Sequence, residues 1–163
     1  MNLKPILFAI LTLIPAGLGY QALKKPSNPA LVSYIAETYK KPFHDVVEVL
    51  EAVKHASEAH GVKEELIMAV IATESSFDMN ATSKSGALGL MQIHSSSGKE
   101  YGDSIKEHVN NGVELLANYI NRFGTKAGIM AYNMGAANVA KGKTNEKFYQ
   151  QVKKRVILFG TRG

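Results

Sequence analysis

Residues 64–77 read Glu-Glu-Leu-Ile-Met-Ala-Val-Ile-Ala-Thr-Glu-Ser-Ser-Phe, and residues 85–93 read Ser-Gly-Ala-Leu-Gly-Leu-Met-Gln-Ile. After its opening turn the first segment is apolar on all sides, which is typical of a helix buried in a core. Leu66, Val70 and Glu74 lie four residues apart, so Glu74 continues an apolar stripe of that helix. The Ser, Asn and Gly residues that follow Phe77 predict that the helix stops there, with Glu74 in its last turn.

This position gives Glu74 two reasons for a raised pKa. Apolar surroundings disfavour the charged carboxylate, and so does the negative end of the helix dipole. A carboxyl that keeps its proton near neutral pH can act as a general acid. The alternative is an ordinary solvated Glu at a helix end, and the helix pattern alone favours that simpler interpretation.

Apolar spacing predicts further helices on both sides of this segment. The expected helices cover residues 30–39, 43–60, 63–76, 104–123, 125–132 and 145–159. Gly61, Gly124 and Gly160 are placed to end three of them. No sustained two-residue alternation appears, so strands are expected to be minor. The sequence predicts a mainly α domain, with a long turn or a small hairpin after the helix that carries Glu74.

Composition narrows the classes of protein to consider. The chain has 163 residues, a formal net charge of +5 and no cysteine, which excludes disulfides and thiolate chemistry. A basic surface favours an anionic polymer, but the Lys residues are scattered, so nucleic-acid binding is not expected. The five histidines form no ligand pair. No metal site and no cofactor are therefore expected.

The N-terminus has the pattern of an export segment. Residues 1–22 combine an early Lys4 with a nearly uncharged stretch from Ile6 to Gly19. Signal-peptide cores run about 7–15 residues and spanning helices about 20, so length favours a signal peptide over an uncleaved anchor in the inner membrane. Residues 23–42 read as a linker and a short helix, and residues 43–163 as the main domain. The expected location is the periplasm or cell envelope.

Three motifs, in this order and spacing, carry a resemblance to a known family. They are Glu74-Ser75-Ser76-Phe77, Ser85 to Ile93, and Ala131-Tyr132-Asn133-Met134-Gly135. Together they resemble the lytic transglycosylases with a soluble-transglycosylase (SLT) domain, glycoside hydrolase family 23, over roughly residues 45–155. The resemblance implies a lysozyme-like fold of the α+β superfamily and peptidoglycan glycan strands as substrate.

The resemblance also implies roles for single residues. Glu74 matches the catalytic acid, which later acts as base. The substrate-binding positions that match are Ser83, Met91, Gln92, Tyr132 and Asn133. Gly86 and Gly89 match glycines of the loop that let the backbone turn, and Gly135 closes the Tyr-Asn motif. After Ile93 the chain departs from the family pattern with His94-Ser95-Ser96-Ser97, which leaves one edge of the expected groove undefined.

A single carboxylate favours one mechanism. Glycoside hydrolysis ordinarily uses two carboxylates, and Asp78, the nearest second acid, is interpreted as a loop-capping residue. With one acid, the 6-hydroxyl of muramic acid would close on C1 of the same sugar and leave a 1,6-anhydro end.

Two alternatives stay open. One is a hydrolytic lysozyme of the same fold, and the other is an inactive peptidoglycan-binding protein. The small size favours a partner such as a secretion, conjugation or pilus machine.

Overall fold

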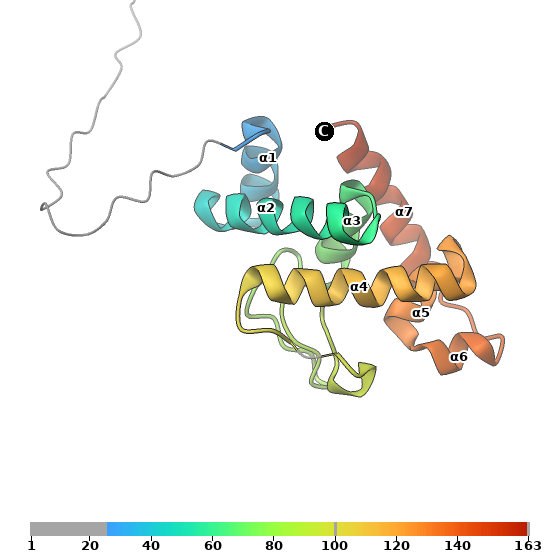
Figure 1. Cartoon of the computed structure of the whole chain (residues 1–163). Coiled ribbons are helices and arrows are strands. Elements are labelled where there is room, and N and C mark those ends of the chain that lie inside the picture. The colour runs from blue at the N-terminus through green and yellow to red at the C-terminus, as the bar shows by residue number, and fades with distance from the viewer. Residues whose placement is uncertain (1–25, 100, 163) are drawn as a thin grey trace, which may run out of the picture.

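The computed structural model describes residues 26–99 and 101–162. The predicted export segment, residues 1–22, lies outside the described residues. The helices are α1 Pro29–Tyr39, α2 Phe43–His60, α3 Glu64–Glu74, α4 Ile105–Phe123, α5 Thr125–Met134, α6 Ala136–Ala140 and α7 Glu146–Gly160, with a short 3-10 turn at Ser95–Ser97 (Figure 1). Within the two described ranges, no helix has the length and apolar character needed to span a membrane.

Local sequence explains where most helices begin and end. Asn28, Ser104 and Asn145 each accept a backbone N–H of the first turn of α1, α4 and α7, respectively. Such side chains satisfy donors that the helix itself leaves without a partner. Gly61 ends α2 with a φ of 66°, in the left-handed region that glycine enters without strain. The predicted bounds of α2 are confirmed at both ends.

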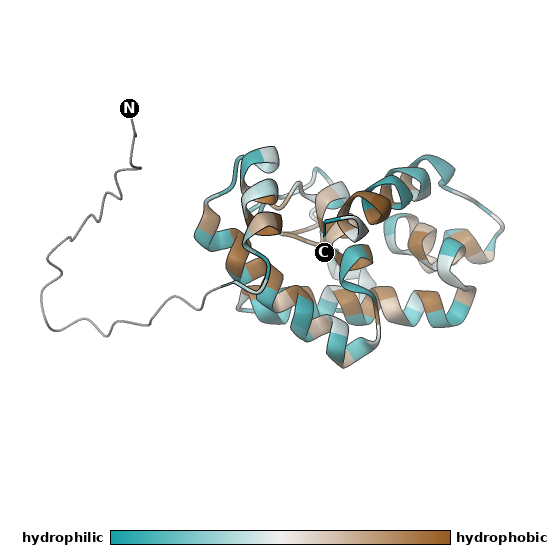
Figure 2. Cartoon of the chain, turned by 90° about the horizontal axis from the view of Figure 1, so that it is seen from above, coloured by the Kyte–Doolittle hydropathy of each residue, from teal (hydrophilic) through white to brown (hydrophobic). Residues whose placement is uncertain are grey.

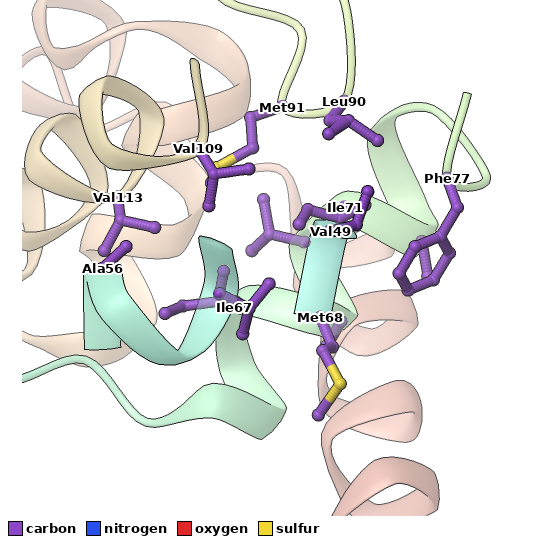
Figure 3. Packing of buried hydrophobic residues seen from close by; sticks show 14 of the residues in the cluster. Val49, Ala56, Ile67, Met68, Ile71, Phe77, Leu90, Met91, Val109 and Val113 are labelled. Carbon is purple, nitrogen blue, oxygen red and sulfur yellow. The ribbon is translucent and has the colours of Figure 1, made fainter. Parts of the chain in front are cut away.

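Helix α3 lies at the centre of the core. Residues 67–72 are all buried, and α3 packs against α2 and α7, while α2 also packs against α4 and α4 against α5. Figure 3 shows side chains of α2, α3 and α4 meeting the buried residues Leu90 and Met91 of the connecting loop. Hydrophilic residues colour the outer faces of the helices (Figure 2). The expectation that this helix is buried on nearly all sides is confirmed.

The segment between α3 and α4 makes a compact loop rather than a sheet. Its only regular pairing in the described part of the chain consists of two isolated antiparallel bridges, Thr82 with Leu88 and Leu88 with Ile93. Hydrogen bonds in both directions join Leu88 and Ile93, each at 3.0 Å. The predicted mainly α class, with a small loop region after the helix that carries Glu74, is confirmed.

Three α-helices differ from the prediction by two residues or more. Helix α3 ends at Glu74, two residues before its expected end. Helix α5 runs on to Met134, two residues beyond the expected end. After Gly135 the chain forms the five-residue helix α6, which was not predicted. Gly135 has a φ of 86°, so it turns the chain sharply between two helices where the sequence pattern indicated a simple stop.

Candidate active site

Glu74 is the last residue of α3, and the chain turns sharply after it. Ser75 ends the helix, and its hydroxyl donates to the Leu90 carbonyl at 2.7 Å. Ser76 and Phe77 both have positive φ, at 54° and 59°, which is uncommon for residues with side chains. Such local strain persists only where the surroundings hold it in place.

The Phe77 ring provides that anchor. It is buried, with its centre 5.0 Å from that of Tyr39 and 6.2 Å from that of Phe159. Aromatic pairs at these separations stabilise beyond the area they bury. Tyr39 is the last residue of α1 and Phe159 lies near the end of α7. The first and last helices therefore both hold the turn that follows Glu74.

Burial gives Glu74 the acid character expected from the sequence. The side chain is half-buried, and loss of hydration raises its pKa from 4.5 to about 7. A hydrogen bond from the Asn133 side chain acts in the opposite direction, because it stabilises the carboxylate. A carboxyl with a pKa near 7 can both give and take a proton at neutral pH.

Asn133 belongs to α5. Its side chain is exposed, and its Oδ1 accepts a hydrogen bond of 2.7 Å from Nδ2 of Asn145. The structure therefore brings Glu74 and Asn133 together, two residues that the sequence motifs place 59 positions apart.

Tyr132, also on α5, joins the site to the loop. Its hydroxyl donates to the Met91 carbonyl at 2.8 Å. Burial raises the pKa of Tyr132 well above 10, and the negative charge of Glu74 raises it further. The phenol is therefore a neutral donor that lies close enough to Glu74 to sense its charge.

Met91 lies in the core, whereas the sequence places it in the sugar groove. Its side chain is completely buried and packs on α4, where a Cβ at Gly112 would come within 2.6 Å of the Met91 sulfur. The absence of a side chain at Gly112 makes room for it. The structure thus places the Met91 side chain in the core and its backbone carbonyl against Tyr132, so no contact of this side chain with substrate is proposed.

Gln92 is held by its own loop. Its Nε2 donates to the carbonyls of Ala81 at 3.1 Å and Gly89 at 2.9 Å, and its φ is 48°. These bonds lock an unusual backbone conformation next to the site. The side chain is half-buried. The side-chain oxygen, Oε1, is the atom of Gln92 that could accept a hydrogen bond from a ligand.

Ser83 has a similar local engagement. It accepts from the Ala87 N–H at 2.9 Å and contacts the Ser85 hydroxyl at 3.0 Å. The two loop glycines differ: Gly86 has open space where a Cβ would stand, while at Gly89 a Cβ would come within 2.5 Å of the Tyr101 ring. Both have positive φ, at 85° and 66°. Glycine is thus favoured at both positions by the positive φ, and at Gly89 also by the close approach of Tyr101.

His108 is a site-supporting residue that the sequence reasoning missed. Its Nε2 accepts from the Met91 N–H at 3.0 Å, so the proton must lie on Nδ1, which donates to the Tyr101 carbonyl at 2.9 Å. Burial lowers the pKa of His108, which keeps the ring neutral. A single His on the apolar face of a helix does not indicate from the sequence which backbone group it will bind. It lies 34 residues from Glu74.

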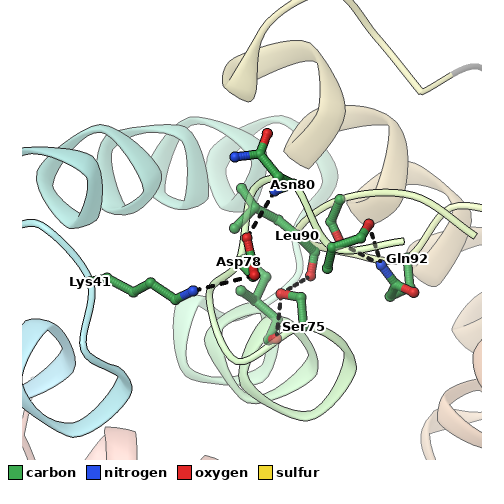
Figure 4. A network of polar contacts seen from close by, with 9 residues as sticks. Lys41, Ser75, Asp78, Asn80, Leu90 and Gln92 are labelled. Atoms are coloured by element: carbon green, nitrogen blue, oxygen red, sulfur yellow. Dashed lines mark hydrogen bonds and ion pairs between the residues drawn. The ribbon is translucent and has the colours of Figure 1, made fainter. Parts of the chain in front are cut away.

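Asp78 caps the turn after Glu74, as predicted. One of its oxygens accepts from the Asn80 N–H at 3.0 Å, and the other lies 3.5 Å from Nζ of Lys41 (Figure 4). The same view shows Ser75 bonded to Leu90, and Gln92 bonded within its loop. Both oxygens of Asp78 therefore take part in holding the turn.

Large hollows occur away from Glu74. One of about 790 Å³ lies between α1, α2 and the start of α3, and one of about 390 Å³ lies between α2, α4, α5 and α7. Glu74 lines neither of them. The candidate site is therefore identified by its chemistry: an acid with a raised pKa, with an amide and a phenol beside it.

Comparison with known proteins relates the sequence to one family. Residues 51–154 match the sequence profile described as the Transglycosylase SLT domain. Over 44 residues the chain is 57% identical to membrane-bound lytic murein transglycosylase C of Edwardsiella ictaluri, and 54% identical to the protein of the same name in Pectobacterium atrosepticum. Each match covers 27% of this chain and only 12% of the relative.

Solved structures share the fold at low sequence identity. An inactive Glu-to-Gln mutant of lytic transglycosylase Slt from Pseudomonas aeruginosa aligns with a TM-score of 0.61 at 16% identity, over 82% of this chain and 30% of that one. The 70 kDa soluble lytic transglycosylase of Escherichia coli aligns with a TM-score of 0.52, also at 16% identity, over 82% and 29%. At this identity the likeness concerns the fold alone.

Proposed function

Because the chain belongs to the transglycosylase SLT domain family, we propose that it is a lytic transglycosylase that cleaves the glycan strands of peptidoglycan. The proposed target is the β-1,4 bond between N-acetylmuramic acid and N-acetylglucosamine. The observation that carries the proposal is the place of Glu74, where hydrogen bonds from Ser75 to Leu90 and from Tyr132 to Met91 join the three family motifs. Burial there raises the pKa of Glu74 to about 7.

One group serves as acid and then as base in this reaction. Protonated Glu74 gives its proton to the glycosidic oxygen, and the bond from C1 of the muramic acid to that oxygen breaks. The 6-hydroxyl of the same sugar then bonds to C1, and its proton returns to the Glu74 carboxylate. No water is consumed, and the new end is a 1,6-anhydro sugar. The N-acetyl group of the substrate can assist at C1, where a second carboxylate would otherwise act.

The engagement of Asp78 supports the single-acid mechanism. Its two oxygens contact the Asn80 N–H and Lys41, so this nearest acid has the loop-capping role expected from the sequence, and Glu74 is proposed as the only acid that acts. Asn133 and Tyr132 are proposed to face the sugar beside Glu74. Ser83 and Gln92 are proposed to contact it from the loop, with the Gln92 carbonyl as the free acceptor.

The experiment that tests the proposed acid compares two variants in lysis of purified peptidoglycan sacculi. Glu74→Gln removes the transferable proton with little change in shape and is expected to abolish lysis, while binding to pelleted sacculi persists. Glu64→Gln, in the first turn of the same helix, is the matched control and is expected to keep lysis. Equal lysis by the Glu74→Gln variant would refute the assignment. A wild-type chain that binds sacculi without lysing them would favour the inactive peptidoglycan-binding alternative.

The proposed organisation follows the sequence pattern. Residues 1–22 are proposed as a signal peptide or membrane anchor, residues 23–42 as a linker with α1, and residues 43–163 as the catalytic domain. Two relatives are named as membrane-bound, which supports a place in the cell envelope or periplasm. The small size of the chain is the reason for proposing a secretion, conjugation or pilus machine as its partner. Fractionation of cells that produce the full chain tests the location.

A further inference from the structure

A chain of side-chain amides connects the start of α7 to Glu74. The backbone N–H of Phe148 donates to Oδ1 of Asn145 at 3.1 Å, where Asn145 caps α7. Nδ2 of Asn145 then donates to Oδ1 of Asn133 at 2.7 Å. The Asn133 side chain in turn acts on Glu74 as a donor would, because it lowers the pKa of that carboxyl. Two hydrogen bonds and the interaction of Asn133 with Glu74 thus connect a helix terminus to the proposed acid.

The helix cap fixes the direction of the whole chain. An amide side chain can usually be turned by 180° with little change in shape, so its orientation depends on its partners. A backbone N–H can only donate, so the cap requires the oxygen of Asn145 and leaves its NH2 group for Asn133. Asn133 must then present its oxygen to Asn145 and its NH2 group to Glu74.

Asn145 is itself well anchored. Its backbone N–H points at the sulfur of Met130 on α5, at 3.3 Å, which ties the start of α7 to the helix that carries Asn133. Asn145 is half-buried, whereas the neighbouring Glu146 is exposed. The Glu146 carboxylate bonds to Lys126 and Gln150, so it does not compete for Asn133.

We propose that Asn145 is a positioning residue that sets the orientation of the Asn133 amide, so that Asn133 donates a hydrogen bond to the Glu74 carboxylate. The polar partners of the Asn145 side chain and backbone N–H in the described part of the chain are Met130, Asn133 and Phe148, and Glu74 is not among them. The consequence for catalysis rests on the proposed function, whereas the orientation of the amide does not. No motif of the family resemblance includes Asn145.

Among the neighbours of Glu74, the Asn133 amide is the group whose orientation can change the pKa of the acid. Tyr132 on α5 is the titratable neighbour that interacts electrostatically with Glu74, and its phenol stays neutral because its pKa is raised well above 10. Burial removes water from Glu74 and raises its pKa, whereas the interaction with Asn133 lowers it. Loss of that interaction should therefore raise the pKa of Glu74 further.

The test uses Asn145→Ser in the full chain, with a matched control. Ser caps a helix about as well as Asn, but its hydroxyl is too short to reach Asn133. The control is Asn28→Ser, which makes the same change at the cap of α1. There Asn28 also accepts a first-turn N–H, from Leu31 at 3.0 Å, and its Nδ2 donates elsewhere, to the Arg162 carbonyl at 2.9 Å. Both variants lose one side-chain donor and keep a cap.

The measurement is the pKa of the Glu74 carboxyl, followed by ¹³C NMR and assigned with Glu74→Gln. We expect Asn145→Ser to raise this pKa by roughly half a unit to one unit, and Asn28→Ser to leave it in place. The alkaline limb of the pH profile of sacculus lysis should move upward by the same amount, because Glu74 would keep its proton to higher pH. An unchanged pKa in Asn145→Ser would overturn the proposal.

The NMR readout separates this inference from the proposed function. A raised pKa with an unmoved lysis profile supports the positioning by Asn145 and contradicts Glu74 as the acid. If Asn145→Ser does not fold, Asn145→Thr replaces it, because Thr is also a favoured cap, adds no charge and is too short to reach Asn133. A raised pKa of Glu74 is expected there too, and the absence of a rise would overturn the proposal equally.

Discussion

The hydroxyl of Tyr132 donates to the carbonyl of Met91 at 2.8 Å, across 41 residues of chain. This bond joins α5, which carries Asn133, to the loop that holds Gln92. The Met91 N–H is held at the same time by His108 on α4. The loop is therefore fixed from two helices at one residue, and Tyr132 serves the site through this loop as well as through its nearness to Glu74.

Tyr132→Phe should remove the hydrogen bond to the loop while its ring still fills the same space in the core. Loss of one hydrogen bond should cost about 0.5–1.5 kcal/mol in the free energy of unfolding, and lysis of sacculi should fall roughly tenfold or more. Urea denaturation and a turbidity assay measure the two effects. Tyr149→Phe on α7, whose ring contacts Lys126, is the control and should change neither. Full activity in Tyr132→Phe would show that the loop keeps its place without this bond.

The raised pKa of Glu74 predicts a pH-dependent cost of folding. Between the ordinary value of 4.5 and the folded value of about 7, folded Glu74 binds more protons than unfolded Glu74. Stability from this residue is therefore lost as the pH rises through that interval. Glu74→Gln lacks the effect, so its stability relative to the unchanged protein should improve from about pH 4.5 to pH 7 and stay level above. Denaturation curves at several pH values test this, and a constant difference would contradict the raised pKa.

His108 predicts the opposite pH dependence. Its pKa is lowered below 6.5, so the folded protein binds fewer protons there than the unfolded chain. Its contribution is present above the unfolded value and is lost as the pH falls below about 6.5. His108→Phe should remove this acid sensitivity and cost about 1–3 kcal/mol, since the buried Met91 N–H loses its acceptor. His55→Phe, on the exposed face of α2, should do neither.

The two loop glycines allow backbone strain and crowding to be measured separately. Gly86→Ala and Gly89→Ala both place a side chain at positive φ, which costs roughly 1–2 kcal/mol. Only at Gly89 does the added Cβ meet the Tyr101 ring, whose hydroxyl is bonded to the Met79 carbonyl at 3.0 Å. Gly89→Ala should therefore be the more destabilising variant by about 1 kcal/mol or more. Equal losses in thermal denaturation would contradict the close approach.

Features that depend on neighbouring residues in the chain could be predicted. The periodic apolar positions and Gly61 gave both ends of α2, and the buried α3 followed from its uninterrupted apolar run. The loss of hydration that raises the pKa of Glu74 was also accessible, because its helix stripe is apolar. The capping role of Asp78 is a contact over two residues, which turn chemistry predicts.

Features that depend on contacts across the fold could not. The burial of Met91 requires the bare backbone of Gly112 on another helix, and no pattern around Met91 signals it. His108 and Asn145 act through partners 17 and 12 residues away, at positions where helix patterns indicate an ordinary core residue and an ordinary cap. Helix α6 was missed because Gly135 turns the chain between two helices.

The most direct test of the central claim is mass spectrometry of the fragments released from purified sacculi. A lytic transglycosylase that uses Glu74 alone should release fragments with 1,6-anhydro ends, each lighter by one water than the product of hydrolysis. Glu74→Gln should release none. Fragments with reducing ends alone would contradict the account and assign the chain to the hydrolytic lysozyme alternative.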